Sequence, residues 1–246
     1  MIILTGCLLA ALSYFTLFPA LMNYANSALA AAQKISNVTV TADAAGCSFQ
    51  GSPIAREIHF SLSCDIAKRA LAQAFIPYSN ASAPAGTAAT VKIGDKVFTA
   101  PTGKLNATAE RFDKDSAVAI AAFRKDVSGA AVGLTAKADE KGMNKPVVLA
   151  ILVLLVIYVT LVYEPIAAML VEMFPTRIRY TSMSLPHHIG NGWFRGLLPT
   201  TAFAMIAATG DIYYGLWFPV VVALGTFVIG MLLVRESKDI EIYAKN

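Results

Sequence analysis

YEPIAAMLVEMFPTRIR, residues 163–179, joins a long apolar run to two arginines. The run before it, Val147–Val162, carries no charge. Pro175 lacks a backbone N–H and therefore stops or kinks a helix. Arg177 and Arg179 are costly in hydrocarbon, so they are expected at the membrane surface. Because short basic loops between spans face the cytoplasm, this stretch predicts both the end of a membrane helix and the orientation of the chain.

The composition is that of a membrane protein. The chain has 246 residues, of which 56% are hydrophobic and 15% are charged, whereas soluble domains carry roughly 25% charged residues. Most polar residues lie between Gln33 and Lys145. The net charge of +4 therefore belongs mainly to the loops. No basic run alternates with aromatic residues, so a nucleic-acid partner is not predicted.

Four segments are long and apolar enough to cross a bilayer, which takes about 20 residues. We expect an all-α polytopic membrane protein in which a small α+β domain separates the first span from the second. The predicted parts are spans at 1–24, 146–174, 185–208 and 215–234, the domain at 33–145, a cytoplasmic loop at 175–184 and a cytoplasmic tail at 235–246. This topology places both termini in the cytoplasm and the domain on the opposite side of the bilayer.

The first segment has two other interpretations. A secretory signal would explain the sequence Ala28-Leu29-Ala30, which is typical of a cleavage site, but the segment has no basic start. The residues before Cys7 resemble a lipoprotein box, but they lie too close to Met1 for an apolar region to precede them. A retained membrane helix fits these residues better than either.

Within the domain, short patterns predict individual elements. Strict alternation on either side of Gly94-Asp95 indicates a hairpin. Helical spacing of Ile66, Ala70 and Leu71 indicates an amphipathic helix. The expected elements are a strand at Val38–Thr41, a helix at Cys64–Ala74, a loop at Ser79–Gly86, a hairpin at Thr90–Thr99, and a helix at Glu110–Lys125 with Phe112, Val118, Ala119, Ala122 and Phe123 on its apolar face.

The predicted export of this domain bears on its cysteines. In an oxidising compartment Cys47 and Cys64 are expected to form a disulfide, which would stabilise the domain by about 3 kcal/mol. The alternative is two buried free thiols. Two cysteines and the distant His59 lack the spacing of a zinc site, so neither a metal nor another cofactor is predicted. Enzymatic activity is not expected, because the chain has no phosphate-binding glycine loop, nucleophile elbow or paired catalytic carboxylates.

The third predicted span is unusually polar. It contains His187, His188, Asn191 and Arg195. Such side chains are not tolerated against lipid. This span should therefore be buried among other helices or line a cavity.

The sequence from Tyr163 onward resembles that of a known family. Glu172–Arg179, EMFPTRIR, resembles the loop after the tenth helix of major facilitator superfamily transporters. The longer run 163–204 is similar to the metabolite:proton symporter branch, which includes carriers of shikimate, α-ketoglutarate, citrate and proline or betaine. Glu236-Ser237-Lys238-Asp239 is similar to the tail of that branch. The resemblance implies that the four spans are helices nine to twelve, and that the domain is an enlarged periplasmic loop.

The resemblance also implies roles for single residues. Glu172, Arg177 and Arg179 would form a cytoplasmic gate, although arginines here also serve simply to anchor topology. Glu164 and Arg195 replace residues that are usually glycine in the family. These two charges either handle a proton or substrate, or reflect drift or a sequence error. His187, His188 and Asn191 would lie near the substrate path, or at the membrane interface.

The implied function is proton-coupled symport of a small organic acid or zwitterion across a bacterial inner membrane. Substrate would bind between two six-helix halves, so the missing N-terminal half is an expected partner beside the lipid, the solute and the proton. The chain would then be a fragment, a truncated product or one part of a split transporter. The alternative function is a membrane-anchored periplasmic interaction or binding protein without transport.

Overall fold

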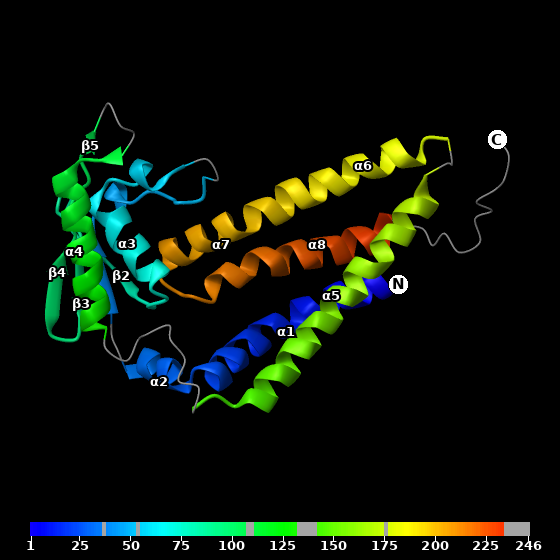
Figure 1. Cartoon of the computed structure of the whole chain (residues 1–246), viewed down its shortest axis with the longest axis horizontal. Coiled ribbons are helices and arrows are strands. Elements are labelled where there is room, and N and C mark those ends of the chain that lie inside the picture. Colours follow the sequence, from blue (N-terminus) through cyan, green and yellow to red (C-terminus); the bar gives the residue numbers. More distant parts are fainter. Residues whose placement is uncertain (36–37, 53–54, 107–110, 132–141, 175–176, 234–246) are drawn as a thin grey trace. The chain divides into compact units, whose positions relative to one another are not determined.

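The computed structural model of the chain describes residues 1–35, 38–52, 55–106, 111–131, 142–174 and 177–233 (Figure 1). It is mostly helical with a small sheet region, and it divides into two compact units. One unit comprises residues 1–19, 146–199 and the chain from 216 onward, and the other comprises residues 20–145 and 200–215. The predicted tail at 235–246, with its Glu236–Asp239 motif, and Pro175 lie outside the described residues.

Three helices of the described chain are long and apolar enough to cross a membrane. They are α1 (Ile2–Ala25), α5 (Lys145–Met173) and α8 (Trp217–Leu233), the last preceded by the short helix η4 (Tyr214–Leu216). They correspond to the first, second and fourth predicted spans. The predicted third span is also helical, but it is not among these three. The chain is therefore compatible with a multi-pass membrane protein.

Small residues on α1 allow its neighbours to approach closely. Gly6, Cys7, Ala10 and Ala11 are the buried positions of α1. A Cβ added at Gly6 would lie 2.8 Å from Cγ2 of Val162 on α5. On another side, the rings of Phe15 and Trp217 have centroids 5.0 Å apart, which brings α1 against the start of α8. Contacts through small residues are typical of helices that pack within a bilayer.

The second unit contains a four-stranded sheet in the order β2-β1-β3-β4. Its strands are β1 (Val38–Ala42), β2 (Ser79–Ser82), β3 (Thr90–Ile93) and β4 (Lys96–Thr99). β1 pairs parallel with β2 and antiparallel with β3, and β3 pairs with β4 as a hairpin. Gly94 turns the hairpin at φ +59°, a conformation that glycine adopts without strain. The predicted hairpin and first strand are confirmed.

Helices α3 (Ser63–Gln73) and α4 (Lys114–Ala130) contact each other and the sheet. Alternate residues of β1 are buried beneath them, as expected of a strand with one covered face. The core is built from aliphatic and small side chains, chiefly Val40, Ile66, Leu71, Ile76, Val91, Ile120, Phe123 and Val127. We call residues 38–131 the sheet domain. Five further short elements are α2 (Ser27–Ile35), η1 (Ala44–Gly46), η2 (Glu57–His59) and the paired two-residue strands β5 (Leu105–Asn106) and β6 (Arg111–Phe112).

Two expectations for this domain were wrong. The predicted loop after residue 78 begins with strand β2, because its polar residues pair with β1 at the exposed edge of the sheet. Of the residues predicted for the apolar face of α4, Phe123 is buried, but the others were misplaced. Asp113 caps α4 by accepting a hydrogen bond from the backbone N–H of Ser116, so Phe112 precedes the helix. Val118 is 69% exposed, and Ala119 and Ala122 are exposed too.

The loop between β1 and α3 is fixed by covalent and polar contacts. Cys47 and Cys64 form a disulfide, with their Cα atoms 5.2 Å apart. The Asp65 carboxylate is almost fully buried and accepts hydrogen bonds from the backbone N–H and the hydroxyl of Ser48, at 2.7 and 2.8 Å. Since Asp65 lies in the first turn of α3, the helix dipole also favours its negative charge.

Candidate functional site

The most unusual element of the chain is an interrupted helix. It runs as α6 (Arg179–Ile189), a π-helical segment η3 (Gly190–Arg195) and α7 (Gly196–Thr209). The sequence predicted a helix only from Leu185, whereas α6 begins at Arg179 and so includes part of the predicted loop. A π-helical turn is wider than an α-helical one, is rare, and occurs frequently at functional sites. The break falls at Gly190-Asn191-Gly192, where two glycines flank a polar residue.

The π-helical segment aligns three polar side chains along one face. The side-chain amide of Asn191 lies 3.0 Å from Nε2 of His187 and donates to the His187 carbonyl at 3.1 Å. In an ideal α-helix, Arg195 would be rotated by about 80° from His187, because successive residues advance by about 100°. The wider π turn reduces this rotation, so Arg195 stays close to the line through His187 and Asn191. We call these three residues the polar face of the interrupted helix.

The opposite face of the same segment is apolar. Ile189 and Trp193 lie roughly half a turn away from the polar face, and they are 45% and 70% exposed. His188 lies between the two faces, and its Nδ1 is 2.7 Å from the carbonyl oxygen and 3.2 Å from the hydroxyl of Ser184. The helix is therefore amphipathic over its interrupted part.

Glu164 lies in α5, one residue before Pro165, and its side chain is exposed. Among the described residues it forms neither a hydrogen bond nor an ion pair with another side chain, and the same holds for Arg195. The structure thus does not bring these two predicted site residues together with a partner.

Of the predicted gate residues, Glu172 and Arg177 are exposed. Arg179 is half-buried, and its Nε donates a hydrogen bond to the Phe174 carbonyl at 3.1 Å. Phe174 directly follows α5, whose last carbonyls have no partner within the helix. A basic side chain near a helix C-terminus satisfies such carbonyls. Arg179 therefore caps the C-terminal end of α5, a role for which the sequence carries no local signal.

A second polar site surrounds the C-terminal end of α7. Three polar side chains of the sheet domain donate hydrogen bonds to the last carbonyls of this helix. Lys68 donates to Ala208 at 3.5 Å, Tyr78 donates to Ala207 at 2.5 Å, and Asn80 donates to Ala208 at 3.3 Å and to Thr209 at 3.0 Å. We call Lys68, Tyr78 and Asn80 the α7 collar. It satisfies carbonyls that a helix leaves without partners, and the cation of Lys68 complements the negative end of the helix dipole.

The backbone reinforces the α7 collar. The Tyr78 N–H donates to the Gly210 carbonyl at 3.1 Å. Gly210 has φ +84°, and a Cβ at this position would overlap the Tyr78 carbonyl oxygen. Only glycine fits here, both because of its conformation and because of this close approach.

Arg69 adds an aromatic contact to the same region. Its guanidinium lies 5.6 Å from the ring centroid of Phe60 and 5.4 Å from that of Phe203 on α7. It also donates to the side-chain carbonyl of Gln50 at 3.2 Å, and Gln50 in turn donates to the Asp65 carbonyl. This chain of contacts links the disulfide-bonded loop to α7.

Burial shifts the pKa values of two collar residues and of the neighbouring Arg69. It lowers the pKa of Lys68, an effect that the charge of Asp65 partly offsets. Burial also lowers the pKa of Arg69 and raises the pKa of Tyr78 well above its usual range. Tyr78 therefore remains a neutral hydrogen-bond donor at every physiological pH.

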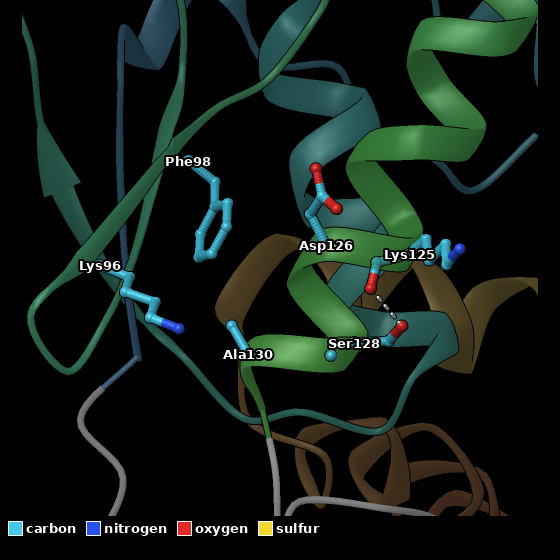
Figure 2. Close-up of a pocket in the computed structure, with 7 residues that line it drawn as sticks. Lys96, Phe98, Lys125, Asp126, Ser128 and Ala130 are labelled. Atoms are coloured by element: carbon cyan, nitrogen blue, oxygen red, sulfur yellow. Dashed lines mark hydrogen bonds between the residues drawn. The ribbon is translucent and has the colours of Figure 1, made fainter.

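The sheet domain also has a shallow groove of about 550 Å³ between β4 and the last turns of α4 (Figure 2). Lys96, Phe98, Asp126 and Ala130 line it, and Lys96 extends across it toward Ala130. Lys125 points away from Phe98, and its carbonyl accepts a hydrogen bond from the Ser128 hydroxyl. The groove is therefore lined by charged residues of both signs, Lys96, Lys125 and Asp126, beside the ring of Phe98. No group of histidine, cysteine, aspartate and glutamate side chains that could hold a metal ion occurs in the described part of the chain.

No protein-family model, curated protein or solved structure matches the chain. The predicted site residues were recognised from patterns within short segments of the sequence. By contrast, the α7 collar joins residues about 130 positions apart. No pattern in a single sequence could have revealed it.

Proposed function

We propose that the chain is the C-terminal part of a secondary active transporter, which carries a small organic acid or zwitterionic metabolite together with a proton across a bacterial inner membrane. The observation that carries this proposal is the polar face of the interrupted helix, His187, Asn191 and Arg195. Polar side chains and irregular backbone persist at membrane depth only where they are buried in protein or line water. Discontinuous helices are typical of substrate sites in secondary transporters.

In this proposal the interrupted helix is the third span, and its polar face looks into the transport path. Helices that are not part of this sequence, supplied by a longer parent or by a separate subunit, would cover the opposite side of that path. Glu164 and Arg195 would then contact substrate or proton within the assembled transporter. The sequence resemblance to the metabolite:proton symporters supports the same assignment.

Transport should be tested in the assembly as it exists in the membrane. The tagged chain is extracted with its bound partners under mild conditions and reconstituted into vesicles with an inward proton gradient. Labelled organic acids and betaines are offered one at a time. We expect accumulation of one class that a protonophore abolishes and that Asn191→Ala reduces. If no solute accumulates in vesicles that contain the correctly inserted chain, the proposal is wrong.

One observation favours a second function. The sheet domain has its own core and a disulfide, and its buried residues come almost entirely from its own elements. A membrane-anchored binding protein would need such a domain. Solute binding by the reconstituted chain without any uptake would support this alternative, whereas protonophore-sensitive uptake would contradict it.

A further inference from the structure

A bulky aromatic residue occupies a backbone conformation that usually requires glycine. Phe75 has φ +55° and is the only described residue other than glycine with a positive φ. It follows the last residues of α3, where the Phe75 N–H bonds the Ala72 carbonyl at 3.2 Å and the Ile76 N–H bonds the Leu71 carbonyl at 3.0 Å. These two bonds define a Schellman motif, in which glycine is the usual residue at this position.

The side chain of Phe75 does not contribute to the core of the sheet domain. It is 53% exposed, whereas its neighbour Ile76 is 2% exposed. A phenyl ring at this position therefore strains the backbone and leaves apolar surface uncovered. A glycine would stabilise the same turn without either disadvantage, so the folding of the domain does not explain the ring.

The position of Phe75 along the chain indicates what covers it. Tyr78 follows three residues later and bonds the carbonyls of Ala207 and Gly210. Three residues span at most about 11 Å, so Phe75 lies within that distance of the collar. The candidate membrane span of α8 starts at Tyr214, four residues after Gly210. The end of a span meets the headgroup region, so residues 210–214, which join the collar to this span, are expected at that level.

The neighbouring residues have the composition of such an interface. The collar contributes Lys68 from the domain. The turn after α7 contributes Tyr213 and Tyr214, and α8 begins with Trp217. Tyrosine, tryptophan and lysine gather where a protein crosses from hydrocarbon to water, because their apolar bodies and polar tips match that boundary.

We propose that Phe75 anchors the sheet domain to the lipid bilayer by inserting its ring into the interface of the leaflet at which α8 begins. The ring then exchanges its contact with water for contact with lipid, which offsets the strain of its backbone. This proposal depends on α8 crossing the membrane, but it does not depend on transport.

Depth-dependent fluorescence quenching tests the anchor in the full chain. Trp193 and Trp217 are replaced by phenylalanine, and a single tryptophan is introduced as Phe75→Trp. A matched variant carries Val118→Trp on α4, where the native side chain is even more exposed. Both proteins are reconstituted into phosphatidylcholine vesicles with and without bromine on the acyl chains. We expect brominated lipid to quench the tryptophan at position 75 by about twofold and to leave that at position 118 unchanged, because only the first lies at the interface.

Two results would overturn the proposal. If brominated lipid fails to quench the tryptophan at position 75 while acrylamide does, the side chain lies in water. If neither quenches it, the side chain is covered by protein, as a docked helix or second subunit would cover it. A further variant, Phe75→Gly, tests the folding role. We expect amide exchange in α3 to stay as slow as in the parent or to become slower, whereas faster exchange would show that the ring holds the domain together and would contradict the anchor.

Discussion

The contact between the sheet domain and α7 can be measured through Gly210. In Gly210→Ala, the new methyl group would overlap the Tyr78 carbonyl oxygen, and the backbone at φ +84° would be strained. The strain alone costs about 1 kcal/mol. Moving the two segments apart also weakens the hydrogen bond from the Tyr78 N–H to Gly210 and the one from the Tyr78 hydroxyl to Ala207, which contribute about 0.5–1.5 kcal/mol each.

Gly86→Ala provides a matched control. Gly86 has φ +79°, almost the same as Gly210, but a Cβ at this position meets no atom within 4 Å. Both variants thus share the strain of the backbone, and only Gly210→Ala disturbs the collar. The difference between them should be about 2 kcal/mol, from the weakening of the two hydrogen bonds.

Amide hydrogen exchange reports this difference, because local opening of the collar exposes the Tyr78 N–H. We expect the peptide that contains Tyr78 to exchange about 30-fold faster in Gly210→Ala than in Gly86→Ala, since 1.36 kcal/mol corresponds to a factor of ten. The protein is measured in lipid nanodiscs, with the α3 amides as an internal reference. Equal exchange rates in the two variants would refute the contact.

Three further predictions concern the sheet domain. Replacing Cys47 and Cys64 together by serine should lower its unfolding free energy by about 3 kcal/mol, because the open loop gains conformational entropy; denaturant titration of the full chain in detergent measures this, and an unchanged midpoint would contradict it. The pKa of Asp113 is held low by its hydrogen bond to Ser116, so the cap of α4 should be stable above pH 4 and weaken as the pH falls through the lowered pKa; Asp113→Asn should remove this pH dependence of α4 amide exchange, and a variant as acid-sensitive as the parent would count against the cap. Since burial raises the pKa of Tyr78, the domain should lose stability as the pH rises above about 10, and Tyr78→Phe should weaken that loss; a parent protein whose melting temperature is constant up to pH 11 would disagree.

The parts of the fold that the sequence predicted are those with a local cause. The hairpin at 90–99 follows from alternation around a glycine turn. Helix α3 follows from the spacing of Ile66, Ala70 and Leu71, all of which are buried. The spans α1, α5 and α8 can be recognised from the length and apolar composition of their sequences. In each of these cases the pattern that forms the element lies within the element.

The parts that the sequence missed depend on distant partners. Strand β2 is polar and exposed, so only its pairing with β1 makes it a strand. The buried face of α4 could not be predicted without knowing that Asp113 caps the helix. A shift of one residue in the helical pattern rotates the predicted face by about 100°. The π-helical segment has no periodic signature in six residues. The sequence identified His187, Asn191 and Arg195 as candidates, but their alignment on one face depends on the π-helical backbone.

The central claim is that the interrupted helix presents its polar face to water within the membrane, and thiol accessibility tests this claim most directly. In a Cys7→Ser background, single cysteines replace Asn191 on the polar face and Trp193 on the opposite face, and intact vesicles are treated with a membrane-impermeant maleimide. Because a thiol in apolar surroundings keeps its proton and reacts slowly, we expect Asn191→Cys to react about tenfold faster than Trp193→Cys. Equal rates, or faster reaction at position 193, would contradict a water-lined path along this helix.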